Sequence, residues 1–185
     1  MENENPRGME VDSRTVQRAL AGDRSALAHI YDMYAKSIYR YQYSRVGNAA
    51  DAEDLTSQTF MAVIESLPRY QHRNNFTAWI FQIARSKAMD YFRGNHRHGE
   101  IHEQAADPAQ VDALEAVVRN ESRARLNSLL HLLDEDEREL IRLRYTAELS
   151  FVEIAHLLGR REDAVRKAIR RILDRLSIQM EAHNA

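Results

Sequence analysis

Residues 150–176 read SFVEIAHLLGRREDAVRKAIRRILDRL. Ser150 and Glu153 form the Ser-x-x-Glu pattern of a capping box, which predicts the start of a helix of about two turns. Gly159 has the position of a glycine that ends a helix, and a longer helical pattern follows it. The two segments predict a helix-turn-helix, in which apolar side chains at helical spacing hold the two helices together. These side chains are Ile154, Ala155, Leu158, Val165 and Ile169.

The second helix of this pair is strongly basic, with seven Lys or Arg and three acidic side chains between residues 160 and 175. In DNA-binding proteins of this type the second helix lies in the major groove, where cationic side chains reach guanine edges and phosphates. The outward face predicted for this helix carries Arg166, Lys167, Arg170 and Arg171. The spacing alone fits an amphipathic helix pair with a solvated basic face equally well.

Composition indicates that the rest of the chain is helical as well. The 185 residues include only six Gly and three Pro, too few for the frequent turns of a β-sandwich or barrel. Leu, Ala, Glu, Arg and Gln, which favour helices, dominate instead. We therefore expect an all-α protein. A chain of this length accommodates one ordinary domain or two small ones.

Apolar periodicity, together with the positions of Gly and Pro, divides the chain into two small helical domains. Four helices are predicted in the first domain, at residues 12–21, 23–46, 51–67 and 76–94, with Asp51 at the N-cap of the third. Residues 95–121 lack apolar periodicity and become acidic, which is typical of a flexible linker. Helical patterns then resume and run to about residue 180. The expected domains are therefore 1–94 and 122–185, joined by the linker 95–121.

The net charge of −2 conceals a strong local asymmetry. Besides the basic helix near the C-terminus, residues 85–98 carry four Arg or Lys side chains against one Asp. Between these two segments, residues 100–121 hold six acidic side chains and a single Arg. Two basic patches separated by an acidic spacer indicate binding to nucleic acid, although the overall charge alone would argue against it.

Several classes of protein are excluded by what the sequence lacks. It contains no Cys, which excludes a disulfide framework, a thiolate metal site and a catalytic cysteine. There is no secretory signal or membrane-length apolar run, so we expect a cytoplasmic protein with no membrane insertion of its own. Without a Gly-rich phosphate loop or a Gly-x-Ser-x-Gly elbow, we do not expect an enzyme. His96, His98 and His102 fall in the predicted linker and are interpreted as solvated, so neither a metal nor another cofactor is expected.

Ordered motifs along the chain carry a resemblance to a known family. They are VQRALAGD at residues 16–23, DAEDLTSQTF at 51–60, FTAWIFQIAR at 76–85 and LSFVEIA at 149–155. With these motifs in this order, the chain resembles the extracytoplasmic-function (ECF) sigma factors, group 4 of the sigma-70 family of RNA polymerase sigma factors. The resemblance implies a sigma region 2 helical bundle in the first domain and a sigma region 4 helix-turn-helix in the second.

A sigma factor of this kind is a transcription initiation factor that binds core RNA polymerase, recognises the −10 and −35 promoter elements and assists promoter melting. The resemblance implies that the helix at 51–67 docks on the clamp coiled coil of the β′ subunit, and that the β subunit is contacted as well. An acidic, amide-bearing helix face suits a basic partner helix. An ordinary amphipathic helix with a solvated acidic start fits the spacing equally well. The implied polymerase-binding residues are Asp51, Asp54, Leu55, Gln58 and Thr59.

The same resemblance assigns the two basic patches to the two promoter elements. Capture of unpaired bases needs a pocket, stacking surfaces and a cationic track, which the loop and helix after Tyr70 would supply, whereas Trp79 is expected in the core. The implied −10 contacts are Arg73, Asn74, Asn75, Arg85, Ser86, Lys87, Tyr91 and Arg93. The implied −35 contacts are Ser150, Arg160, Arg161, Arg166, Lys167, Arg170 and Arg171.

Another interpretation of the helix-turn-helix stays open, namely a free-standing transcriptional regulator that binds duplex DNA as a dimer without docking on polymerase. A sigma factor is instead expected to bind DNA weakly alone and strongly within the holoenzyme. The linker would let the two domains reach promoter elements about two helical turns apart. Members of the family are commonly held by anti-sigma proteins, so an anti-sigma factor is also expected as a partner.

Overall fold

The computed structural model describes residues 11–71, 75–96, 130 and 132–182. Within these ranges the chain forms helices and no strand, which confirms the all-α expectation. Residues 97–121 of the expected linker lie outside the described ranges, as does most of the helical pattern that begins the second predicted domain.

The N-terminal bundle consists of α1 (Ser13–Leu20), α2 (Arg24–Val46), α3 (Ala49–Ser66), the short turn η1 (Leu67–Arg69) and α4 (Phe76–His96). Side-chain caps define where its first helices begin. The carboxylate of Asp12 accepts a hydrogen bond from the Thr15 amide, and that of Asp23 accepts one from the Ser25 amide, both at 2.8 Å. Gly47 ends α2 with a φ of 79°, a conformation that favours glycine.

The start of α3 differs from the sequence prediction. Asn48, and not Asp51, is the N-cap residue, because the Asn48 side chain accepts a hydrogen bond from the Asp51 amide at 2.8 Å. Asp51 therefore lies in the first turn, where a negative charge is favoured by the helix dipole. Asn and Asp are both common N-cap residues, and here the N-cap is Asn48, three positions before Asp51.

The core of the N-terminal bundle is formed where α2 crosses α4. Its largest fully buried side chains are Tyr34, Ile38, Tyr41, Ile80 and Phe81. Two hydrogen bonds between buried polar groups join the two helices. The hydroxyls of Tyr34 and Thr77 lie 2.8 Å apart, and the Gln42 amide donates to the Ala84 carbonyl at 2.9 Å. These bonds fix the position of α4 against α2.

The C-terminal bundle consists of α6 (Glu135–Ile141), a π-helical turn η2 (Arg142–Thr146), α7 (Phe151–Leu158) and α8 (Glu162–Ala182). Reciprocal capping boxes open α6 at Asp134 and Glu137 and α7 at Ser150 and Glu153, the second as predicted above. Gly159 ends α7 with a φ of 63°. The pair α7 and α8 is thus the predicted helix-turn-helix.

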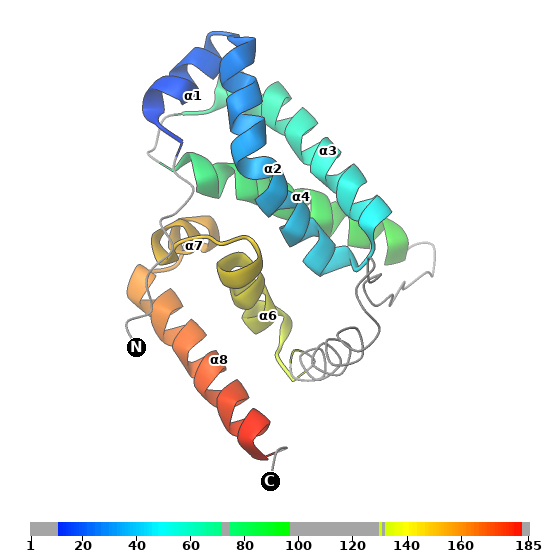
Figure 1. Cartoon of the computed structure of the whole chain (residues 1–185), viewed down its shortest axis with the longest axis vertical. Coiled ribbons are helices and arrows are strands. Elements are labelled where there is room, and N and C mark those ends of the chain that lie inside the picture. Colours follow the sequence, from blue (N-terminus) through cyan, green and yellow to red (C-terminus); the bar gives the residue numbers. More distant parts are fainter. Residues whose placement is uncertain (1–10, 72–74, 97–129, 131, 183–185) are drawn as a thin grey trace, which may run out of the picture.

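The two bundles pack directly against each other, as Figure 1 shows, with α2 against η2 and α4 against α7. Their buried apolar side chains form one continuous cluster. At the edge of this interface the Arg40 guanidinium donates to the Glu148 carboxylate at 2.7 Å. Helix α3 packs on α2 and α4 and lies on the side of the N-terminal bundle away from α8. No described residue outside the N-terminal bundle therefore packs on its outer face in this view.

The capping box of α6 gives a test of the fold. Replacing Asp134 by Ala leaves the Glu137 amide without its side-chain acceptor, so we expect the free energy of unfolding to fall by about 1 kcal/mol. Urea denaturation followed by circular dichroism measures the change. Asp174→Ala serves as the control, because this exposed carboxylate on α8 caps no helix, and it should change the stability much less. Equal losses in both variants would contradict the capping role.

Candidate nucleic-acid interface

The outward face of α8 carries the densest positive charge of the described residues. Val165, Ile169 and Ile172 are buried against the rest of the C-terminal bundle, and their helical spacing turns the opposite face of α8 to solvent. The cations on that exposed face are Arg166, Lys167, Arg170 and Arg171. Of these, only Arg166 has a carboxylate partner among the described residues. Three mutually repelling cations on one helix face are suited to binding a polyanion.

Arg166 is held in place by two side chains that the sequence analysis did not single out. Its guanidinium lies 4.6 Å from the centroid of the Phe151 ring and pairs with Glu162 at 2.5 Å. The Arg144 guanidinium contacts the same ring at 4.3 Å and donates to the Leu149 carbonyl, and burial lowers its pKa. The i,i+4 spacing of Glu162 and Arg166 was visible in the sequence. The contact with Phe151 was not, because it joins α7 to α8.

The remaining predicted −35 residues divide into a structural group and an exposed group. Ser150 is buried, and its hydroxyl accepts a hydrogen bond from the Glu153 amide at 3.2 Å, so it serves as the cap of α7. Arg160 is exposed beside the Asp136 carboxylate at 3.3 Å. Arg161 is exposed in the turn that precedes α8.

The predicted −10 residues on α4 do not share one face. Ser86 and Arg93 are exposed and lie two turns apart on the same side of the helix, next to Arg85. Lys87 and Tyr91 lie on another side, toward α3. The Tyr91 hydroxyl donates to the Asp51 carboxylate of α3 at 2.6 Å. The structure therefore brings together Arg85, Ser86 and Arg93 and turns Tyr91 toward its neighbouring helix.

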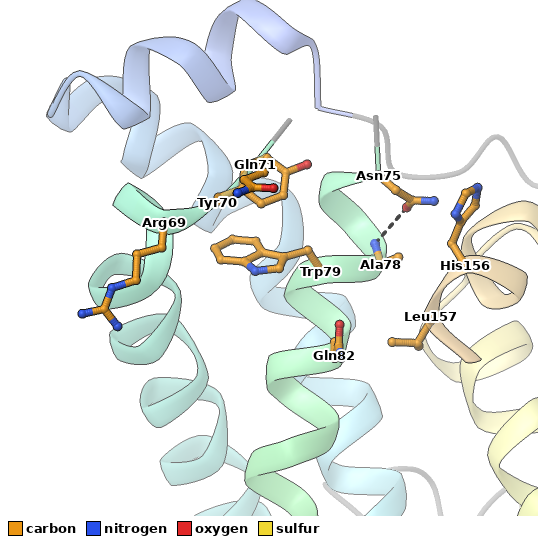
Figure 2. Close-up of a pocket in the computed structure, with 9 residues that line it drawn as sticks. All are labelled: Arg69, Tyr70, Gln71, Asn75, Ala78, Trp79, Gln82, His156 and Leu157. Atoms are coloured by element: carbon orange, nitrogen blue, oxygen red, sulfur yellow. Dashed lines mark hydrogen bonds between the residues drawn. The ribbon is translucent and has the colours of Figure 1, made fainter. Parts of the chain in front are cut away.

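A cavity of about 420 Å³ lies at the N-terminal end of α4, as Figure 2 shows. Asn75 is at its rim and caps α4 by accepting a hydrogen bond from the Ala78 amide at 3.1 Å. Trp79, expected in the core, is half-buried and lines this cavity beside Tyr70, with ring centroids 4.7 Å apart. His156 and Leu157 of α7 line the opposite side. Arg73 and Asn74 lie outside the described residues.

The predicted polymerase-binding residues of α3 also separate into exposed and buried groups. Asp54 and Gln58 are exposed one turn apart, and the Gln58 amide donates to the Asp54 carboxylate at 2.6 Å. Leu55 and Thr59 are buried inside the bundle. The exposed face continues with two apolar side chains that the sequence analysis missed, Met61 (62% exposed) and Ile64 (54%). Their positions, three and six residues beyond Gln58, could have been found from helical spacing.

Other kinds of site find little support in the described part of the chain. No group of three or more His, Asp or Glu side chains there is arranged to hold a metal ion. None of the described helices is long and apolar enough to span a membrane. His98 and His102, interpreted as solvated linker residues, lie outside the described ranges.

Comparisons with known families agree with this architecture. The family model for Sigma-70 region 2 matches residues 30–98, and the model for Sigma-70, region 4 matches residues 129–177. The solved structure of CnrH in complex with the cytosolic domain of CnrY is similar, with a TM-score of 0.69 and 24% identity, covering 91% of this chain and 96% of that one. RpoE of Bartonella quintana, in complex with the anti-sigma factor NepR, gives a TM-score of 0.63 at 22% identity, covering 83% and 96% of the two chains.

Curated relatives are more similar in sequence. The ECF RNA polymerase sigma factor SigD of Mycobacterium tuberculosis is 33% identical over 180 residues, which cover 90% of this chain and 82% of SigD. BldN of Streptomyces coelicolor, also an ECF RNA polymerase sigma factor, is 33% identical over 155 residues, which cover 82% of this chain and 59% of BldN. The two helical bundles with their separate basic faces thus belong to a member of the ECF sigma factors of RNA polymerase, which act in transcription initiation and are transcription factors rather than catalysts.

Proposed function

We propose that the chain divides the work of promoter recognition between three surfaces on two domains. Residues 1–94 contain the polymerase-docking face of α3 and the −10 surface of α4, and residues 122–185 contain the −35 surface of α8. The linker 95–121 joins them. The observation that carries this proposal is the presence of two basic helix faces on separate bundles, with an uncovered acidic and apolar face on α3. The protein would act in the cytoplasm, without a catalytic role of its own.

The −35 surface of this proposal is the exposed face of α8. Lys167, Arg170 and Arg171 have no carboxylate partner among the described residues, so their charges are available to the phosphates and base edges of a major groove. Arg166 is oriented by Phe151 and Glu162, which lowers the entropy lost when it binds a base. Arg160 and Arg161 extend the basic surface at the N-terminus of the helix. Ser150 contributes by capping α7.

The −10 surface is the side of α4 that carries Arg85, Ser86 and Arg93, together with the cavity at Asn75. The half-buried ring of Trp79 and the amide of Asn75 suit the stacking and hydrogen bonding of an unpaired base. Arg73 and Asn74 belong to this surface on the strength of the sequence motif. Lys87 extends the cationic track on the adjacent side of the helix. Tyr91 holds α4 against α3 through its hydrogen bond to Asp51.

The polymerase-docking surface is the outer face of α3. Asp54 and Gln58 supply the acidic and amide groups, and Met61 and Ile64 add apolar area beside them. Apolar side chains bordered by polar ones are typical of protein interfaces, and charge complementarity to a basic coiled coil sets the register. Leu55 and Thr59 are buried and hold α3 in the bundle, and Asp51 is hydrogen-bonded with Asn48 in the first turn of the helix. We propose the β′ clamp coiled coil as the partner, with β contacted elsewhere.

One experiment tests the whole proposal against its rival, a dimeric regulator that acts without polymerase. The purified chain is mixed with bacterial core RNA polymerase, and transcription is measured on randomised promoter templates. Tight association and discrete start sites are expected. Failure to bind polymerase, combined with protection of duplex DNA by a dimer of the chain alone, would favour the rival. Because RpoE of Bartonella quintana was solved with an anti-sigma factor, we also propose an inhibitory protein as a partner of this chain.

The −35 surface is tested by Arg171→Ala. Loss of one cation from the exposed face of α8 should weaken −35-dependent initiation by the holoenzyme by about 1–3 kcal/mol, which is the range for a side chain that reads a base. Run-off transcription on templates with and without the −35 element measures the effect. Arg24→Ala removes the same charge from the exposed start of α2 and should leave transcription unchanged. Full activity of Arg171→Ala would show that α8 reads DNA through other residues.

The docking surface is tested by Asp54→Ala. Removal of this carboxylate should lower the affinity for core polymerase by about 1 kcal/mol or more, because the partner loses an opposite charge at the interface. The thermal midpoint of unfolding should hardly change, since Asp54 is exposed. Asp32→Ala, an exposed acid on α2, is the matched control. Equal polymerase affinity of Asp54→Ala and the parent chain would show that docking uses another face.

A further inference from the structure

One carboxylate is buried where the two bundles meet. Glu139 of α6 is only 4% exposed, and it lies among side chains of the N-terminal bundle. The Tyr41 hydroxyl donates to its Oε1 at 2.7 Å, and Arg45 Nη1 donates to its Oε2 at 2.7 Å. Arg85 Nε lies 3.3 Å from Oε1 as an ion pair. Region 2 thus surrounds an anion that region 4 supplies.

We call the three side chains Tyr41, Arg45 and Arg85 the anion socket. Tyr41 is fully buried, and its pKa is raised by burial and by the charge of Glu139, so its hydroxyl keeps its proton and acts as a donor. The Nε–H of Arg45 makes no hydrogen bond in the described part of the chain, and that of Arg85 is near Glu139 Oε1 but is not aligned for a hydrogen bond. Two guanidinium groups and a hydroxyl therefore converge on one position, and the Nε–H donors of both guanidinium groups are left without a hydrogen bond there.

The packing that places Glu139 in the socket also brings α7 opposite the cavity end of the proposed −10 surface, whereas Ser86 and Arg93 stay exposed. His156 and Leu157 of α7 face Asn75, Ala78 and Gln82 across the cavity at the start of α4 (Figure 2). Arg85 is paired with Glu139 further along the same helix. The cations on the basic face of α8 are exposed among the described residues, where α8 packs mainly on α6 and α7. The closed arrangement therefore affects one DNA-binding surface and not the other.

Binding to both promoter elements requires the bundles to separate. Two helical turns of B-DNA span about 70 Å, whereas α4 and α7 are in direct contact here. Once the bundles part, Glu139 leaves, and Arg45 and Arg85 face solvent beside the −10 surface without a carboxylate. A DNA phosphate is a singly charged oxyanion that accepts hydrogen bonds from guanidinium groups, so it can replace a carboxylate there.

We propose that the anion socket is a binding site for a backbone phosphate of promoter DNA, and that Glu139 occupies it in the closed chain. Closed packing and −10 binding then exclude each other. This inference rests on the proposed function of α4 and adds Tyr41 and Arg45 to it. The occupant of the open site is identified by its chemistry, a phosphodiester group, and the contact carries no sequence information.

The first test removes the competing charge with Glu139→Gln, which keeps the size of the side chain. The probe is a labelled single-stranded DNA of about 15 nucleotides, since phosphate contacts do not depend on sequence. The full-length variant should bind it several-fold more tightly than the parent chain. Its affinity for duplex DNA containing a −35 element should not change, because α8 is uncovered in both forms. Glu148→Gln removes the exposed charge that pairs with Arg40 at the same interface and should change neither affinity.

The second test concerns Arg45 itself. In the Glu139→Gln background, Arg45→Gln should weaken single-strand binding and reduce the salt slope of the affinity by about 0.7, the value for one phosphate contact on single-stranded DNA. Arg45→Lys should restore part of the single-strand affinity and part of the salt slope. Within the polymerase holoenzyme, where the bundles are apart, Arg45→Gln should still weaken binding, whereas Glu139→Gln should have no effect. Arg40→Gln is the matched control on the same helix.

Failure of this inference can be told apart from failure of the proposed function by Arg93→Gln, an exposed α4 residue outside the socket. If Arg93→Gln leaves single-strand binding unchanged, the proposed −10 surface is wrong. If Arg93→Gln weakens binding while the Glu139 and Arg45 variants do not change it, Glu139 forms only a structural ion pair and the socket is wrong.

A cross-linking experiment avoids dependence on any socket mutation. Because the chain has no cysteine, Arg40→Cys and Glu148→Cys introduce a unique thiol pair across the interface, and a short bis-maleimide can join them. The cross-linked chain should lose single-strand binding and keep binding to the −35 duplex. Undiminished single-strand binding by the cross-linked chain would overturn the proposal.

Discussion

The arrangement of the two bundles depends on the contacts of the buried Glu139 carboxylate with the N-terminal bundle. A charge that is almost fully buried is tolerated only when cations and hydrogen-bond donors surround it, and here most of these come from the other bundle. Breaking such a pair by removing one partner costs about 3–5 kcal/mol, whereas an exposed pair contributes about 0–1 kcal/mol. The exposed pair of Arg40 and Glu148 at the same interface therefore adds little. The orientation of region 4 on region 2 follows from one buried charge and the apolar contacts around it.

Local features of the chain could be predicted because they rest on short-range chemistry. The capping boxes at Ser150 and Asp134, and the glycines that end α2 and α7, involve residues no more than a few positions apart. The same reasoning failed at the start of α3, where two residues three positions apart could each serve as the N-cap. The alternation of buried and exposed residues along α8 followed directly from helical periodicity.

What could not be predicted depends on contacts between distant parts of the sequence. A motif names residues without saying which way each side chain points, so the buried Leu55 and Thr59 were grouped with the exposed Asp54 and Gln58. Tyr91 likewise turns toward Asp51 of α3, 40 residues earlier. Glu139 lies 98 residues from Tyr41 and 94 from Arg45. In the sequence it is one of several acids at the start of a helix, and nothing local distinguishes it from its exposed neighbours Glu135 and Asp136.

The acidic side chains also explain how a chain with a net charge of −2 can present two basic surfaces. Non-specific attraction to DNA grows with the number of available cations, so carboxylates next to arginines limit it. Asp136 and Glu162 do this on the surface of region 4, where solvent keeps the pairs weak and DNA can displace them. Glu139 pairs with two cations of region 2, Arg45 and Arg85, from within the interface, where its displacement requires the whole bundle to move. An exposed carboxylate thus only weakens the charge of the arginine beside it. A buried carboxylate also ties the availability of its arginines to the arrangement of the two bundles.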